Sequence, residues 1–135
     1  MAKFNGNKNP CFMNPILLYI SSFFLFSWGT AHLFPTKNII KGFGEISADN
    51  KNIIAMEWIN EGVTLIFLGI LVLAITLADP AQAISRLLYI CVFGFLNVLS
   101  LISIFTGFRV NFLPFKLCPF IFTGSSILIL LGGII

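Results

Sequence analysis

An uncharged apolar run in the middle of the chain restricts the possible folds more than any other feature. No residue between Gly62 and Ala78 is charged, and the run continues a largely apolar stretch that begins soon after Asp49. A helix rises about 1.5 Å per residue and a hydrocarbon core is about 30 Å thick, so this stretch is long enough to cross a membrane. We predict a transmembrane helix here, with its first turns in the interface.

The remaining sequence indicates that the whole chain is one membrane domain. Of its 135 residues, 58% are hydrophobic and only 10% are charged, whereas soluble domains contain about 25% charged residues. A chain this short has too little interior to bury so much apolar surface without a bilayer. The sequence predicts an all-α, polytopic membrane protein, an antiparallel bundle of four transmembrane helices within a single domain, 1–135. The predicted spans cover residues 15–34, 52–78, 80–106 and 115–135.

Residue types at the ends of the spans support these boundaries. Asn14 followed by Pro15 is a typical helix start, since Asn caps the first turn and Pro fits the first helical position. Asp79, Pro80 and Gln82 resemble a capping box at the start of the third span. The second and third spans should therefore form an antiparallel hairpin with almost no loop.

The segment between the first two spans, residues 36–48, is too short to cross a membrane and too apolar for a free loop. We predict that it lies along the membrane surface. Four spans place both chain ends on one side, and the basic residues then divide unequally, with more of them opposite the ends (Lys37, Lys41, Lys51, Arg109, Lys116) than beside them (Lys3, Lys8, Arg86). The positive-inside rule favours cytoplasmic connections and external termini.

A polar stripe at the start of the second span is the strongest candidate for a functional site. Glu57, Asn60, Glu61 and Thr64 are spaced i, i+3, i+4 and i+7, which places them on one helix face. Antiparallel threading brings His32, near the end of the first span, to the same depth as Glu61, roughly 9 to 10 Å from the midplane. A carboxylate at that depth is costly unless it is paired, hydrated or protonated. We expect a polar mouth between the first two spans.

Simpler interpretations exist for each of these residues. Glu57 and Glu61 lie in the first turns of a long helix, where acids favour the positive end of the helix dipole and can face water. His32 can be a hydrogen-bonded interface side chain, and the two tryptophans can be belt or core aromatics. Asn97, near the bilayer centre, either bonds to a neighbouring helix or contributes to a ligand site.

The sequence carries no sign of a metal site, a redox pair or a catalytic centre. One histidine and two acids lack the two or three histidines that metal sites usually contain, so no metal is expected. Cys11, Cys91 and Cys118 lie in three different segments without a C-x-x-C pair, and we interpret them as inert thiols. No nucleophile elbow, catalytic triad order, P-loop or dinucleotide motif is present, which argues against an enzyme. The net charge of +3 is spread over the connections, so no nucleic-acid partner is expected.

The chain resembles the DoxX-like group of small four-helix membrane proteins. The resemblance rests on a first span ending near Gly29, a KGFG connection, and a second span with Glu61-Gly62 followed by Leu65 and Gly69. Its specific part covers residues 41–69. The resemblance implies the four-helix architecture, and some DoxX-like members are linked to quinone-coupled sulfur or thiol oxidation. The resemblance does not identify a cofactor for this chain, so the cofactor stays unknown.

These observations lead to one main functional hypothesis and two alternatives. We expect a multi-pass protein of a bacterial-type cell membrane that binds a lipid-like or quinone-like small molecule, or a partner subunit, at the mouth formed by His32, Glu57, Asn60, Glu61 and Thr64, with Asn97 as a further candidate. The expected partners are the lipid bilayer and either a second copy or another membrane subunit. The alternatives are a proton-coupled transporter that uses Glu61 and a purely structural or assembly protein.

Overall fold

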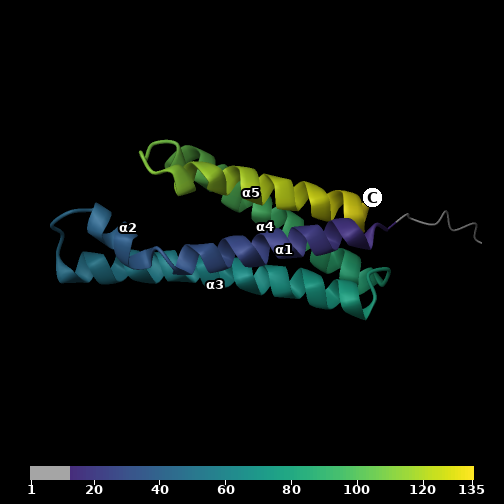
Figure 1. The fold of residues 1–135 in the computed structure, drawn as a ribbon. Helices are drawn as coiled ribbons and strands as arrows, with labels where there is room; N and C mark the ends of the chain where they lie inside the picture. The colour runs from purple at the N-terminus through teal and green to yellow at the C-terminus, as the bar shows by residue number, and fades with distance from the viewer. Residues whose placement is uncertain (1–12) are drawn as a thin grey trace, which may run out of the picture.

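The fold is a bundle of long helices, seen as a ribbon in Figure 1. The computed structural model describes residues 13–135, so Cys11, Lys3 and Lys8 lie outside the described residues. The elements are α1 (Pro15–Leu33), α2 (Thr36–Gly42), α3 (Ala48–Ala78), α4 (Ala83–Gly107), α5 (Leu113–Ile129) and a terminal π-helical turn, η1 (Leu130–Ile134). Helices α1, α3, α4 and α5 with η1 are long and apolar enough to cross a membrane. The predicted all-α fold with four spanning helices is therefore confirmed.

The start of α1 agrees with the sequence prediction, whereas the starts of α3 and α4 differ from it. The Asn14 side chain accepts a hydrogen bond from the Ile16 amide at 3.1 Å, and Pro15 occupies the first helical position, as predicted. Helix α3 begins at Ala48, earlier than the predicted residue 52, because the Ser47 side chain caps it. This adds a polar first turn to the second span.

The predicted capping box at the start of the third span is wrong. Helix α4 begins at Ala83 and not at Pro80. The Asp79 side chain instead accepts from the Ala81 amide at 3.0 Å within the turn, and the Asp79 carbonyl accepts from the Ser85 hydroxyl at 2.6 Å. Asp79 therefore stabilises the tight connection, because an Asp side chain bonds readily to the backbone two residues on.

The helices pack in an order that differs from their order in the chain. Helix α1 lies between α3 and α5, and α5 packs along α4, whereas α3 and α4 contact each other only sparsely although a short turn joins them. The start of α1 and the end of the chain lie at one end of the bundle, where the Asn14 amide donates to the Gly132 carbonyl at 3.0 Å. Helix α2 and the α4–α5 connection lie at the opposite end (Figure 1).

Glycines allow α1 and α3 to approach backbone to backbone. A Cβ atom on Gly29 would lie 2.6 Å from the Gly62 carbonyl oxygen, and one on Gly69 would lie 2.9 Å from the Ser22 carbonyl oxygen. The Ser22 hydroxyl also donates to the Gly69 carbonyl at 2.6 Å. Small residues of this kind are the usual means of close helix packing in membranes. This contact sets the positions of the side chains that follow it on both helices.

The core fills the half of the bundle nearest the chain ends and its middle. Its completely buried side chains come from all four spans (Leu18, Leu25, Leu65, Val72, Tyr89, Leu96, Phe122, Ile129). The Tyr89 hydroxyl, deep in this core, lies 3.0 Å from the Thr76 hydroxyl, so its polar group is satisfied. The opposite half, toward α2, is less completely packed and contains the candidate site.

Candidate functional site

The polar stripe of α3 faces a cavity of about 480 Å³. All four stripe residues line it: Glu57 and Asn60 are exposed, and Glu61 and Thr64, deeper along the helix, are half-buried. The i, i+3, i+4, i+7 pattern thus produces one polar wall. The cavity is a partly open cleft, and its size is typical of small-molecule sites.

The other walls of this cleft, which we call the α3–α4 cleft, are mainly apolar. They come from α4, from the start of α5, and from α2 and the residue that follows it (Phe95, Leu99, Ile102, Ser103, Thr106, Gly107, Phe115, Cys118, Ile39, Phe43). The cleft lies where α3 and α4, which contact each other only sparsely, diverge away from the turn that joins them (Figure 1). The predicted mouth between the first and second spans therefore lies between the second and third.

His32 lies behind the cleft, enclosed by aromatic rings. Its side chain is 3% exposed. The imidazole stacks on Trp58, with ring centroids 4.4 Å apart and planes 25° apart, and Trp28 contacts it edge-on at 5.9 Å. The Trp58 indole N–H donates to the His32 backbone carbonyl. The two tryptophans thus form the walls of a histidine pocket and fix the ring in one orientation.

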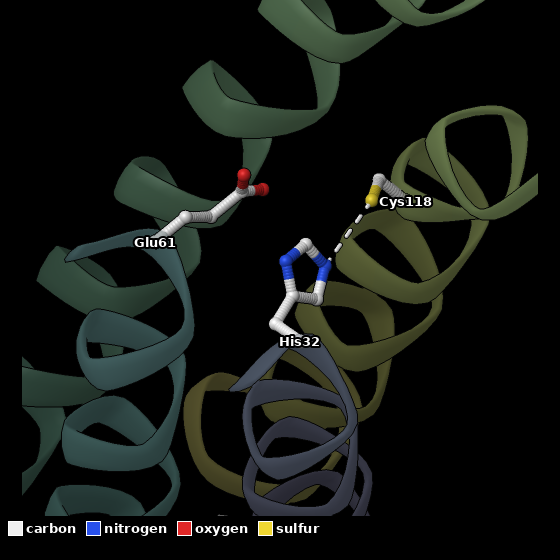
Figure 2. A group of neighbouring side chains, drawn as sticks. All are labelled: His32, Glu61 and Cys118. Atoms are coloured by element: carbon white, nitrogen blue, oxygen red, sulfur yellow. Dashed lines mark hydrogen bonds between the residues drawn. The ribbon is translucent and has the colours of Figure 1, made fainter. Parts of the chain in front are cut away.

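Cys118 and Glu61 approach this imidazole from two other helices (Figure 2). The Cys118 sulfur lies 3.7 Å from His32 Nε2 and also contacts the Pro114 carbonyl oxygen at 3.4 Å. One ring nitrogen of His32, one carboxylate oxygen of Glu61 and the Cys118 sulfur all lie within 4.8 Å of one another. We call these three residues the His–Glu–Cys cluster. Figure 2 shows the second ring nitrogen, Nδ1, on the side of Glu61, and Nδ1 is buried without a hydrogen-bond partner among the described residues.

The backbone explains why these three side chains meet. His32 follows Gly29 by about one helical turn and Glu61 precedes Gly62, so the close α1–α3 contact brings both to the same level. Cys118 lies in the first turns of α5, which packs against α1 on the other side. The equal depth of His32 and Glu61, expected from counting residues, is present in the structure.

Asn97, the further candidate from the sequence, does not line the cleft. It is exposed on α4, and its side-chain amide donates to the Phe93 carbonyl of the same helix at 2.7 Å. Arg109, in the α4–α5 connection, and Lys116, near the start of α5, do not line the cleft either. Among residues 13–135, the cleft therefore offers Glu61 no basic partner.

Sequence reasoning missed Cys118. It is buried and contacts His32, whereas Cys91 is exposed. The signal that could have identified it is its position: it lies near the start of the fourth span, at the same end of the bundle as His32 and Glu61. A single cysteine in an apolar segment otherwise looks like any small hydrophobic residue.

The fold and site define the class: an all-helical, multi-pass membrane protein with four spans, a partly polar cleft and a His–Glu–Cys cluster in which the histidine and the cysteine are buried. Comparisons with protein-family models, with characterised proteins and with solved structures give no match. The DoxX-like resemblance stays a prediction.

Proposed function

We propose that this protein lies in a bacterial-type cell membrane and binds a small amphipathic molecule, lipid-like or quinone-like, in its α3–α4 cleft. The observation that carries the proposal is the composition of the cleft. One wall presents the polar groups of Glu57, Asn60, Glu61 and Thr64, and the remaining walls are largely aromatic and aliphatic. Small-molecule sites are typically apolar cavities with a few polar groups that fix orientation.

The distribution of these groups suggests how a ligand would lie. Its polar part would contact Asn60, Glu61 and Thr64, whose side chains supply both hydrogen-bond donors and acceptors. Its apolar part would lie along Leu99 and Ile102 on α4, which line the facing wall. A quinone ring with a short tail or a lipid with one chain matches this division.

The extent of the cleft favours binding over the transport alternative. The lining residues nearest the end of the bundle that holds the chain ends are Thr64 on α3 and Phe95 on α4. Beyond them the bundle is filled by completely buried side chains such as Leu65, Leu96 and Phe122. A ligand can therefore enter from one end, and a proton-coupled transporter would need a second conformation that opens this core.

The test is ligand-induced thermal stabilisation of the full chain in detergent. The probes are a ubiquinone analogue with a decyl tail and a lysophosphatidylglycerol. Leu99→Trp would place an indole in the cleft, whereas Val98→Trp introduces the same group at a neighbouring position that is 54% exposed and does not line the cleft. We expect a probe to stabilise the unmodified protein and V98W but not L99W, and Glu61→Gln to abolish the shift.

The same variants show whether a small molecule or a second copy of the chain occupies the α3–α4 cleft. Equal stabilisation of L99W and the unmodified protein would reject the cleft as the binding site, and unchanged stabilisation in E61Q would remove Glu61 from it. If neither probe stabilises any form and L99W alone disrupts an oligomer seen by light scattering, the cleft is an interface for a second copy. Proton release on adding a candidate cation would instead support the transporter alternative.

A further inference from the structure

We propose that the His–Glu–Cys cluster is a binding site for a thiophilic divalent metal ion of the zinc class. The cluster brings a nitrogen, a carboxylate oxygen and a sulfur ligand from α1, α3 and α5 to one point. These are the three donor types that zinc accepts in proteins. The proposed small-molecule binding uses Glu61 and gives no reason for an imidazole and a thiol to lie beside it.

The distances are close to those of a formed site. With bonds of about 2.0 to 2.3 Å, ligand atoms around a tetrahedral zinc ion lie roughly 3.3 to 3.8 Å apart. The separation between the Cys118 sulfur and His32 Nε2 is 3.7 Å, within this range. The three ligand atoms are at most 4.8 Å apart, so the cluster needs a contraction of no more than roughly 1 to 1.5 Å. Glu61 can supply it, because its half-buried side chain rotates about three bonds.

His32 offers one ring nitrogen to the ion. Nε2 lies 3.7 Å from the Cys118 sulfur and is the nitrogen placed to bind the ion together with that sulfur. The other ring nitrogen, Nδ1, is buried without a hydrogen-bond partner among residues 13–135 and carries the ring proton when Nε2 is bound to a metal. The imidazole is also held firmly by Trp58 and Trp28, so its position is set before any ion arrives. Preorganised ligands of this kind are what a metal site requires.

A catalytic Cys-His-Glu relay would use the same residue types. In a relay the nucleophile lies at one ring nitrogen and the carboxylate accepts a hydrogen bond from the other, and here Cys118 lies at Nε2 with Glu61 on the Nδ1 side. The cluster nevertheless differs from a relay, because Nδ1 makes no hydrogen bond to Glu61 and the Glu61 oxygen lies within 4.8 Å of the Cys118 sulfur itself. The three ligand atoms can therefore surround one ion, which favours coordination over nucleophilic catalysis.

Charge and donor softness identify the class of ion. One thiolate and one carboxylate carry two negative charges, so a divalent cation leaves the site neutral, which lowers the cost of placing it inside a membrane. Sulfur and imidazole donors favour zinc-like ions over Mg²⁺ and Ca²⁺, which prefer oxygen. Three protein ligands leave a fourth position, and because Glu61 and Cys118 also line the α3–α4 cleft, that position faces the cleft.

Cobalt(II) is the probe for this site, because a sulfur ligand gives it a charge-transfer absorption band that zinc lacks. The protein is purified at full length in detergent without a polyhistidine tag, treated with chelator and titrated with Co²⁺. We expect a saturable sulfur-to-cobalt band that Zn²⁺ displaces. Quenching of tryptophan fluorescence should follow the same titration, since both tryptophans of the chain contact His32.

Variants then assign the ligands. Cys118→Ser should remove the band, and His32→Gln should weaken Co²⁺ binding by about 100-fold or more, given that loss of even an outer contact weakens metal sites by about 10 to 100-fold. The matched controls are a Cys11→Ser/Cys91→Ser variant, which keeps only Cys118, and Glu45→Gln, at an exposed glutamate that does not line the cleft. Both controls should bind Co²⁺ like the unmodified protein.

Three results would overturn the proposal: no saturable band in the folded, unmodified protein, a band that persists in C118S, or a band lost in the C11S/C91S control. If C118S does not fold, zinc-edge X-ray absorption of the unmodified protein decides, because the proposal requires a sulfur neighbour at about 2.3 Å together with nitrogen or oxygen at about 2.0 to 2.2 Å. Metal binding that survives L99W would separate this site from the small-molecule site. Failure of either proposal thus leaves the other testable.

Discussion

The contact between α1 and α3 yields a sharp prediction for Gly29→Ala. The added methyl group would lie 2.6 Å from the Gly62 carbonyl oxygen and 2.8 Å from the Ile66 amide nitrogen. Ordinary non-bonded contacts between heavy atoms are about 3.5 Å or longer. Both obstacles are backbone atoms of a continuous helix, so rotation of a side chain brings no relief. The two helices must separate by up to roughly 1 Å at this point.

The magnitude follows from two opposing terms. Overpacking of a well-packed contact costs about 1 to 3 kcal/mol. Replacing Gly by Ala inside a helix returns about 0.5 to 1 kcal/mol, because alanine loses less backbone freedom on folding. We therefore expect G29A to lower the free energy of unfolding by about 1 kcal/mol, and by at most about 2.5 kcal/mol. The separation should also move His32 away from Glu61, since the contact that aligns them is at Gly29.

The assay is unfolding by sodium dodecyl sulfate in mixed micelles, followed by tryptophan fluorescence. The matched control is Gly94→Ala on α4, where an added methyl group meets no atom within 4 Å. G94A should be as stable as the unmodified protein or more stable by about 0.5 to 1 kcal/mol. If G29A proves as stable as G94A, the close α1–α3 contact is not a determinant of the fold and our account of how His32 and Glu61 are aligned is wrong.

Three further substitutions test smaller features. Ser22→Ala should destabilise the protein by about 1 kcal/mol in the same unfolding assay, since it removes the 2.6 Å bond to the Gly69 carbonyl; an unchanged midpoint would contradict this. Asn97→Ala should change stability by less than about 0.5 kcal/mol, because the amide is exposed and bonds only within its own helix, and a large loss would restore an interhelical role. Gly44→Ala should cost about 1 to 2 kcal/mol, since Gly44 has φ +73° and Ala disfavours that region; a neutral result would show that this turn relaxes freely.

The spans and their polar stripe were predictable because they depend on local chemistry. Length, hydropathy and the Asn14 cap fix the first helix without reference to its neighbours. The depth of His32 and Glu61 follows from counting residues along straight helices. Their proximity in the structure shows that such counting suffices when the two helices are in contact.

Helix pairing was not predictable in the same way. The short turn at Asp79 suggested that the second and third spans pack together, yet α3 packs on α1 and diverges from α4. Lipid covers apolar helices as well as a neighbouring helix does, so hydrophobicity gives no preference between partners. The relevant signal was steric, in Gly29, Gly62 and Gly69, and its meaning depends on which helix each glycine faces. For the same reason Cys118 could not be placed beside His32 before α5 was placed.

The divergence of α3 from α4 affects how the affinity of a ligand for the α3–α4 cleft must be measured. A molecule that dissolves in acyl chains is enriched around the helices by its partition coefficient, so a modest intrinsic affinity gives high occupancy in the native environment. Detergent dilutes the same molecule into empty micelles, and apparent dissociation constants then vary with micelle concentration. The occupancy of the α3–α4 cleft should therefore be measured in nanodiscs, with the mole fraction of the ligand in the lipid held fixed.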